Sequence, residues 1–188
     1  MKIIVGITGA SGVIYGKRLL EALSDKSVET YLIVSRGAEE IIALELSSKR
    51  EDIEKLSTYA YKVNDLLSPL ASGSYFVDGM VIVPCSSKTL GGIAYGYSDN
   101  LLLRAAEVTI KQGRKLILVP RETPLSAISL ENMLKLAKIG VVILPAMPAF
   151  YHNPKNLNQL INFVVGKILD SLEIEHNLFK RWTGEKKG

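Results

Sequence analysis

The stretch IIVGITGASGVIYGKRLL, residues 3–20, decides how this chain folds. Its first part, Ile3–Ile7, is a short apolar run rich in β-branched residues, which is typical of a buried strand. Glycine then recurs at Gly6, Gly9 and Gly12, and the apolar residues that follow return at helical spacing. The stretch therefore predicts a strand, a tight polar loop and a helix in direct succession.

The glycine-rich loop has the composition of a phosphate cradle. Glycines let the backbone turn sharply and bring its N–H groups close to an anion, and the helix N-terminus adds partial positive charge. Ser11 offers a hydroxyl at the start of the helix. The spacing G-x-x-G-x-x-G is neither the dinucleotide fingerprint nor a P-loop, so this stretch alone leaves open a turn that binds no ligand.

Outward from this stretch, further apolar runs of the same character predict additional strands. They lie at residues 28–34, 79–83, 115–119 and 141–144. Helical patterns separate them, so five strands alternate with helices and predict a right-handed, doubly wound parallel sheet of flavodoxin or Rossmann type, in the α/β class. The polar stretch 47–67 is interpreted as a surface excursion that contains a short helix around residues 52–57.

Polar, charged or aromatic side chains follow each predicted strand. They include Ser11, Ser35, Ser86, Arg121 with Glu122, and Tyr151 in the proline-rich loop 145–154. Because ligands of open parallel sheets bind beyond the carboxyl ends of the strands, we expect these side chains to meet at one ligand. Their types favour a planar, phosphorylated ligand, although Ser35 and Ser86 are equally well explained as caps of the helices that follow them.

Composition predicts one domain over residues 1–188, with a tail from about residue 176. The chain has 188 residues and is 47% hydrophobic, which is enough apolar material for a sizeable core. The net charge of +4 is spread along the chain and gathers only at its end, at Lys180, Arg181, Lys186 and Lys187. This distribution argues against a nucleic-acid-binding protein.

Cysteine and histidine are rare in this chain. One cysteine, Cys85, rules out an intrachain disulfide, and with only two histidines, His152 and His176, we expect no metal site. No leader with a cleavage site precedes the first strand, and no apolar run is long enough to span a bilayer. We therefore expect a cytoplasmic protein.

Seven motifs occur in this chain in the same order as in one known family. They are Thr8–Gly12 with Tyr15 and Gly16, Ala71–Ser74, Pro84–Ser86 with Lys88–Leu90, Arg104–Ala106, Pro120–Leu125, Pro148–His152, and Arg181 with Trp182. On these motifs the chain resembles the UbiX-type flavin prenyltransferases, and the resemblance runs from residue 1 to residue 182.

The resemblance implies a metal-independent prenyltransferase, a transferase of alkyl groups other than methyl. Its reaction would join the dimethylallyl group of dimethylallyl monophosphate to reduced FMN, first at N5 and then at C6. The prenylated FMN would serve a UbiD-type decarboxylase. Members of the family form homododecamers, so the resemblance also implies active sites that lie between subunits.

The resemblance further assigns roles to residues at matching positions. FMN would be held by Gly9, Ala10, Ser11, Ser35, Ser86, Ser87, Lys88, Thr89 and Arg121. Dimethylallyl phosphate would be gripped by Lys111, Arg121, Tyr151 and Lys167, with Arg104 and Glu45 from neighbouring subunits. Catalytic roles would fall to Ser11, Glu45, Glu122, Tyr151 and Trp182. Many relatives carry Arg in place of Lys167, and the lysine keeps the charge but lacks the planar fork.

Two alternative functions fit the same fold. The first is an FMN-dependent cysteine decarboxylase of the related flavoprotein class, but such enzymes use an early histidine and this chain has none before His152. The second is a non-enzymatic flavin carrier, which would not need the cations Arg104, Lys111, Arg121 and Lys167. A short-chain dehydrogenase is disfavoured because no Tyr-x-x-x-Lys pair lies in a suitable helix.

Overall fold

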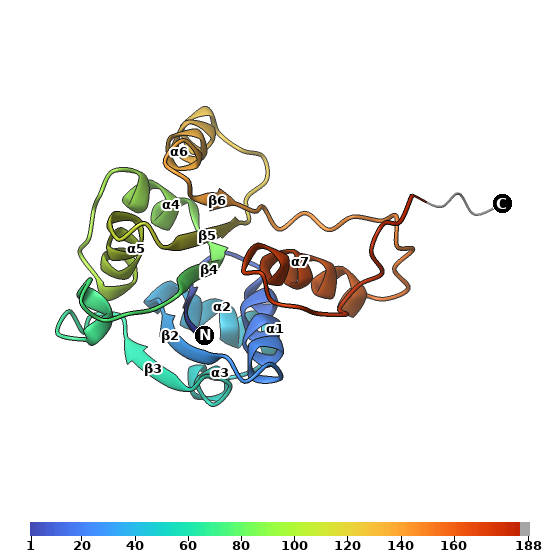
Figure 1. The fold of residues 1–188 in the computed structure, drawn as a ribbon, viewed down its shortest axis with the longest axis horizontal. Helices are drawn as coiled ribbons and strands as arrows, with labels where there is room; N and C mark the ends of the chain where they lie inside the picture. The colour runs from blue at the N-terminus through green and yellow to red at the C-terminus, as the bar shows by residue number, and fades with distance from the viewer. Residues whose placement is uncertain (185–188) are drawn as a thin grey trace.

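The computed structural model describes residues 1–184, so the tail cations Lys186 and Lys187 lie outside the described residues. Its centre is one sheet of six parallel strands in the order β3-β2-β1-β4-β5-β6 (Figure 1). The strands are β1 Lys2–Ile7, β2 Glu29–Val34, β3 Tyr59–Lys62, β4 Gly79–Cys85, β5 Lys115–Pro120 and β6 Val142–Ile143. This is a Rossmann-like strand order, so the predicted doubly wound α/β fold is confirmed.

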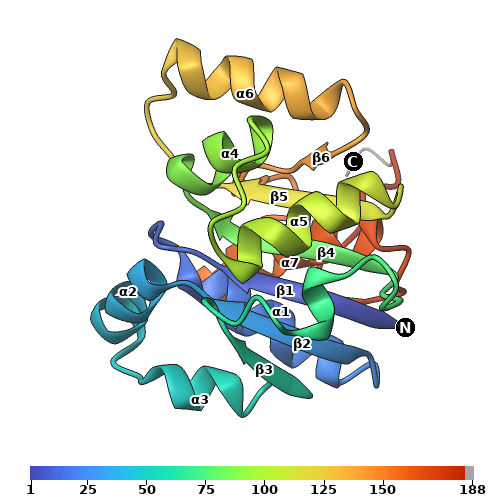
Figure 2. The same ribbon diagram turned by 90° about the vertical axis from the view of Figure 1, so that its left-hand side faces the viewer.

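Helices cover both faces of the sheet. They are α1 Val13–Ser24, α2 Arg36–Leu46, α3 Arg50–Glu54, α4 Ser87–Ala94, α5 Leu101–Lys111, α6 Ala127–Ala137 and α7 Leu157–Ser171, with a short 3-10 helix at Pro69–Ala71. One face packs against α1, α2, α3 and α7, and the other packs against α4, α5 and α6 (Figure 2). The sheet therefore separates two sets of helices, which decides which side chains can meet within one chain.

The central strands are buried on both faces. In β1, Ile3, Val5 and Ile7 pack in the core with α1 and α7, whereas Ile4 packs in the core with α4 and α5. Side chains of a strand alternate between faces, so a strand covered on both sides needs apolar residues at every position. This requirement explains the unbroken apolar runs of the sequence.

The sequence analysis missed β3, which lies in the stretch that it interpreted as a surface excursion. Three of the four residues of Tyr59–Lys62 are exposed, because β3 is an edge strand that pairs only with β2. An edge strand of this kind lacks the apolar run by which the buried strands were recognised. The predicted helix at residues 52–57 exists as α3, but it begins and ends earlier than expected.

The described part of the chain contains no helix with the length and apolar character needed to cross a membrane.

Close contact between α1 and the sheet requires glycine at position 16. A Cβ atom built on Gly16 would lie 2.7 Å from the carbonyl oxygen of Val83 and 2.9 Å from a side-chain carbon of Ile7. Gly91 of α4 is also helical, but its Cβ would meet only the amide of Asn132, at an ordinary 3.6 Å. Of these two helical glycines, only Gly16 is therefore fixed by packing.

We predict opposite outcomes for alanine at these two glycines. Gly16→Ala should lower the free energy of unfolding by about 1–3 kcal/mol, because the methyl group meets a backbone carbonyl that cannot yield. Gly91→Ala is the matched control, and it should leave stability unchanged or raise it by up to about 1 kcal/mol through helix propensity. Urea unfolding at a fixed protein concentration measures both, and a Gly16→Ala protein as stable as the control would contradict the packing argument.

Candidate active site at the carboxyl edge of the sheet

The order of the strands places the topological switch point, where open α/β sheets bind ligands in a crevice, between β1 and β4. These strands are neighbours, but the chain leaves β1 toward β2 and leaves β4 toward β5, so their loops part at this point. Thr8 joins the two loops. Its hydroxyl donates to the carbonyl oxygen of Pro84 at 2.7 Å and accepts from the backbone N–H of Ser86 at 2.8 Å, and the side chain is buried.

Three helices begin at this edge, and their N-termini are capped in different ways. Gly12 caps α1 with a positive φ of 103°, a conformation that favours glycine. Ser35 caps α2 and Ser86 caps α4, each through a side-chain oxygen that accepts from a backbone N–H. The partial positive charges of the three helix ends thus gather at one edge, which favours an anion there.

Gly9 lets its loop approach the start of α2. A Cβ atom at Gly9 would lie 3.0 Å from the carbonyl carbon of Gly37, in the first turn of α2. Any side chain at position 9 would push this loop away from the start of α2. The glycine repeat of the opening stretch therefore has two local causes, the contact at Gly9 and the left-handed conformation at Gly12.

A carboxylate already lies on the N-terminus of α1. One oxygen of Glu45 accepts from the N–H groups of Gly12, at 2.9 Å, and Val13, at 3.2 Å. The resemblance assigned Glu45 to a neighbouring subunit's site, whereas here it contacts the loop of its own chain, because the last turn of α2 packs beside the start of α1. The loop thus demonstrably offers N–H groups to an anionic oxygen.

The loop after β5 adds a cation and a carboxylate to the same edge. Arg121 donates from Nε to the carbonyl oxygen of Ser11 at 3.2 Å. The carboxylate of Glu122 accepts from the hydroxyl of Ser87 at 3.2 Å. The structure therefore brings Arg121 to the loop that carries Ser11, and Glu122 to Ser87 at the start of α4.

An aromatic cluster forms a second group of candidate residues. The ring of Tyr151 meets the ring of Trp182 edge to face at 5.6 Å, and it meets Phe163 of α7 at 5.9 Å. After α7 the chain turns back alongside this helix, and Trp182 reaches the loop that carries Tyr151 (Figure 1). The two aromatic residues to which the resemblance gives a role therefore lie in contact.

Lys167, the third candidate in this region, is tied to Asp170. Its ammonium group lies 3.3 Å from Oδ2 of Asp170, while Arg181 lies 2.7 Å and His176 lies 3.1 Å from Oδ1. Burial raises the pKa of the Asp170 carboxyl, but the hydrogen bonds from Arg181 and Lys167 outweigh this and lower it below its usual value. Asp170 is therefore held in its charged form.

The cations of α5 do not join these groups within one chain. Arg104 and Lys111 belong to the helix layer opposite α7, so the sheet separates them from Lys167. Arg104 instead donates to the carbonyl oxygen of Ala71 at 3.1 Å and to Glu107 at 2.9 Å. For Lys111, which the resemblance grouped with Lys167, this is a correction for the single chain: a phosphate site that includes both requires a second chain.

Sequence reasoning gave no role to Thr8, Asp170 or the buried ring of His176. Thr8 is the first polar residue after the first strand, which is the signal that could have singled it out. Asp170 follows Lys167 by three positions in a helix, a spacing at which side chains can pair. No sequence pattern links either of them to His176 and Arg181.

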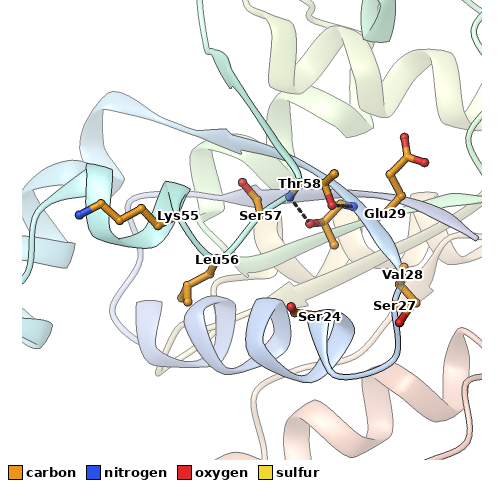
Figure 3. Close-up of a pocket in the computed structure, with 9 residues that line it drawn as sticks. Ser24, Ser27, Val28, Glu29, Lys55, Leu56, Ser57 and Thr58 are labelled. Atoms are coloured by element: carbon orange, nitrogen blue, oxygen red, sulfur yellow. Dashed lines mark hydrogen bonds between the residues drawn. The ribbon is translucent and has the colours of Figure 1, made fainter.

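A separate hollow of about 380 Å³ lies at the opposite edge of the sheet, where β2 and β3 begin (Figure 3). It is lined by Ser24, Ser27, Val28, Glu29, Thr30, Lys55, Leu56, Ser57 and Thr58. The hydroxyls of Thr30 and Thr58 each accept from the other's backbone N–H at 3.0 Å. None of the predicted site residues lines this hollow, so the carboxyl edge is the better candidate.

The chain is similar to known proteins in both sequence and structure. Residues 1–173 match the family described as Flavoprotein. The chain is 56% identical over 182 residues to flavin prenyltransferase UbiX of Methanocaldococcus jannaschii, a match that covers 97% of this chain and 98% of that protein.

Two solved structures are similar over nearly the whole chain, each with a TM-score of 0.96. The first is a dodecameric FMN-dependent UbiX-like decarboxylase from Escherichia coli O157:H7, 46% identical, covering 98% of this chain and 100% of that one. The second is AnUbiX (PadA1) in complex with FMN and dimethylallyl pyrophosphate, 42% identical, covering 98% of each chain.

We predict that the Thr8 hydroxyl holds the crevice together. Thr8→Val keeps the shape of the side chain but leaves the N–H of Ser86 without its partner, and the Pro84 carbonyl keeps only the backbone N–H of residue 8 at 3.3 Å, so the change should lower the free energy of unfolding by about 1–3 kcal/mol. Thr8→Ser keeps the hydroxyl and should cost clearly less. Urea unfolding compares the two variants, and equal stabilities would show that the bridge contributes nothing.

We also predict that Cys85, at the end of β4, is chemically inert in the folded protein. Burial raises the pKa of its thiol to about 12, and only the thiolate is nucleophilic. A thiol reagent at mildly alkaline pH should therefore fail to label the native protein and should label it fully in guanidinium. Fast labelling of the native protein would contradict the buried position of this side chain.

Proposed function

This chain belongs to the UbiX-type flavin prenyltransferases of the flavoprotein family, and from that premise we propose that it prenylates reduced FMN. The dimethylallyl group comes from dimethylallyl monophosphate and is joined to the flavin at N5 and then at C6, which closes a fourth ring. One allylic carbon–oxygen bond breaks and inorganic phosphate leaves. The AnUbiX complex contains FMN and dimethylallyl pyrophosphate, which supports FMN and a dimethylallyl donor as the substrates.

The observation that carries the proposal is the anion-binding edge at the β1/β4 crevice. Glu45 engages N–H groups at the start of α1, so an anionic oxygen is stable at this point. A phosphate at the same edge fits the helix ends and the close-packed glycines. The FMN site would comprise Gly9, Ala10, Ser11, Ser35, Ser86, Ser87, Lys88, Thr89 and Arg121.

The leaving phosphate explains the need for several cations. Ionisation of an allylic phosphate places negative charge on the leaving group, and fixed cations lower the energy of that charge. Lys167 and Arg121 supply two, and Arg104 and Lys111 lie on the other face of the sheet. We therefore propose a homo-oligomer with sites between subunits, and the dodecameric UbiX-like structure favours a dodecamer.

Tyr151 and Trp182 give this site an aromatic wall. An allylic cation is attracted to the faces of aromatic rings, and rings that exclude water protect it from quenching. The two rings are in contact, but both are largely exposed in the single chain. We propose that a neighbouring subunit and the bound substrates cover them.

Proton transfer falls to residues near the flavin edge. Glu122 and Ser11 belong to loops that Arg121 joins, and Glu122 is exposed, so its carboxylate can take the proton that leaves N5. Glu45 is a third candidate, and release from Gly12 would free its carboxylate for this role.

Among residues 1–184, no cluster of three or more histidine, cysteine or acidic side chains is arranged to bind a metal.

Among the alternatives, a cysteine decarboxylase is disfavoured by the identity to a flavin prenyltransferase and by the absence of an early histidine. A flavin carrier leaves the cation set unexplained. Transfer of the product to a UbiD-type decarboxylase and a cytoplasmic location both stay predictions.

We predict that Glu122→Gln separates flavin binding from catalysis. Anaerobic incubation with reduced FMN and dimethylallyl monophosphate should give a flavin one prenyl unit heavier by mass spectrometry, with matching phosphate release. The variant should bind FMN normally but react about 10²–10⁴-fold more slowly, the usual size of a general-base contribution. Glu131→Gln, an exposed carboxylate on α6, is the control and should react at the normal rate. Unmodified flavin from the native protein would refute the proposed activity.

A further inference from the structure

The segment after α7 runs back along this helix as an antiparallel strap. We define the strap as residues 176–182. His176 lies opposite Asp170, Phe179 lies against Phe163 at 4.8 Å, and Trp182 lies against Tyr151. Successive residues of the strap thus contact residues that lie progressively earlier in the sequence. The contacts carry the strap from the end of α7 to the aromatic cluster.

A glycine in α7 makes room for the strap. A Cβ atom built on Gly166 would lie 2.5 Å from a ring carbon of Phe179 and 2.7 Å from a ring carbon of His176. Gly166 is buried beneath these two rings. The surface of α7 is therefore complementary to the strap at Gly166.

The polar fastening of the strap is a single carboxylate. Nδ1 of His176 accepts from the backbone N–H of Leu178 at 3.2 Å, so the ring proton lies on Nε2, which faces Oδ1 of Asp170. Arg181 donates to the same oxygen at 2.7 Å. The side chain of His176 is only 1% exposed, so this bond is shielded from water.

The other oxygen of Asp170 serves a different group. Oδ2 lies 3.3 Å from the ammonium of Lys167, a longer contact than the one with Arg181. Lys167 has a flexible stem, and 48% of its side chain is exposed. The two carboxylate oxygens thus have different partners: Oδ1 binds the strap, and Oδ2 binds the ammonium of Lys167. Lys167 can therefore move away while the strap stays bound to Oδ1.

We infer that Asp170 is a positioning residue that couples the strap to the cation of the prenyl-donor site. Through His176 and Arg181, Asp170 keeps Trp182 against Tyr151. It also holds the ammonium of Lys167 until the phosphate of the substrate binds that ammonium instead. The inference rests on the proposed function for the identity of that phosphate, but the fastening of the strap does not. In the described part of the chain, no other carboxylate contacts both Lys167 and the strap.

The chain supplies its own probe for this coupling. Trp182 is the single tryptophan, so the tryptophan fluorescence of the protein reports on the strap alone. Asp170→Asn keeps the size of the side chain and removes its charge. Time-resolved fluorescence anisotropy of the ligand-free protein should then show faster local motion of Trp182.

The same variant should change the kinetics in a specific way. We expect KM for dimethylallyl monophosphate to rise about fivefold, the size expected for one partly exposed charge contact, while the affinity for FMN is unchanged. Asp170→Glu should restore part of both effects. Glu173→Gln is the matched control, because this nearby carboxylate pairs with Lys115 and not with the strap.

Clear outcomes would overturn the inference. Unchanged Trp182 motion in Asp170→Asn would show that the carboxylate does not fasten the strap, and a mobile strap with an unchanged KM would show that the two functions are not coupled. Should this variant fail to fold, Arg181→Gln removes the ion pair with Asp170 from the strap and should also speed the local motion of Trp182. An inactive native protein would count against the proposed function alone, since anisotropy needs no reaction.

Discussion

One buried hydroxyl joins the two loops on which the candidate site is built. Thr8 contacts both Pro84 and Ser86 where β1 and β4 lie side by side and the chain departs in opposite directions. Because a buried carbonyl or N–H without a partner is costly, this bridge stabilises the contact between the two loops. It also fixes the distance between the starts of α1 and α4. Their positive ends can act on one ligand only while that distance holds.

The fold could be predicted because its determinants are local. Central strands covered on both faces must be apolar throughout, so β1, β2, β4 and β5 were visible as continuous runs. The strand β3 was not visible, since an edge strand with exposed Tyr59 and Lys62 resembles a polar loop. The contacts at the carboxyl edge were predictable for a similar reason: parallel strands end at the same side, so the residues that follow them, such as Ser11 and Arg121, can meet.

The rest of the site depends on packing between distant segments, which leaves no local pattern. No feature of the sequence around Glu45 indicates that α2 ends beside Gly12. The separation of Lys111 from Lys167 follows from which face each helix covers, and a sequence does not show the face. Asp170 has one partner in its own helix, but the other two arrive only because the chain turns back after α7.

The contact between Glu45 and the start of α1 means that the protein carries its own competitor for the flavin edge. A tethered carboxylate acts at a high effective concentration, so a free metabolite with a single carboxylate gains little by replacing it. A phosphate that displaces it brings more charge and can reach Arg121 and the serine hydroxyls as well. The apparent binding free energy of any anion here is thus the difference between its own interaction with the N–H groups and that of the Glu45 carboxylate. Any anion that binds at the start of α1 must therefore first displace the Glu45 carboxylate.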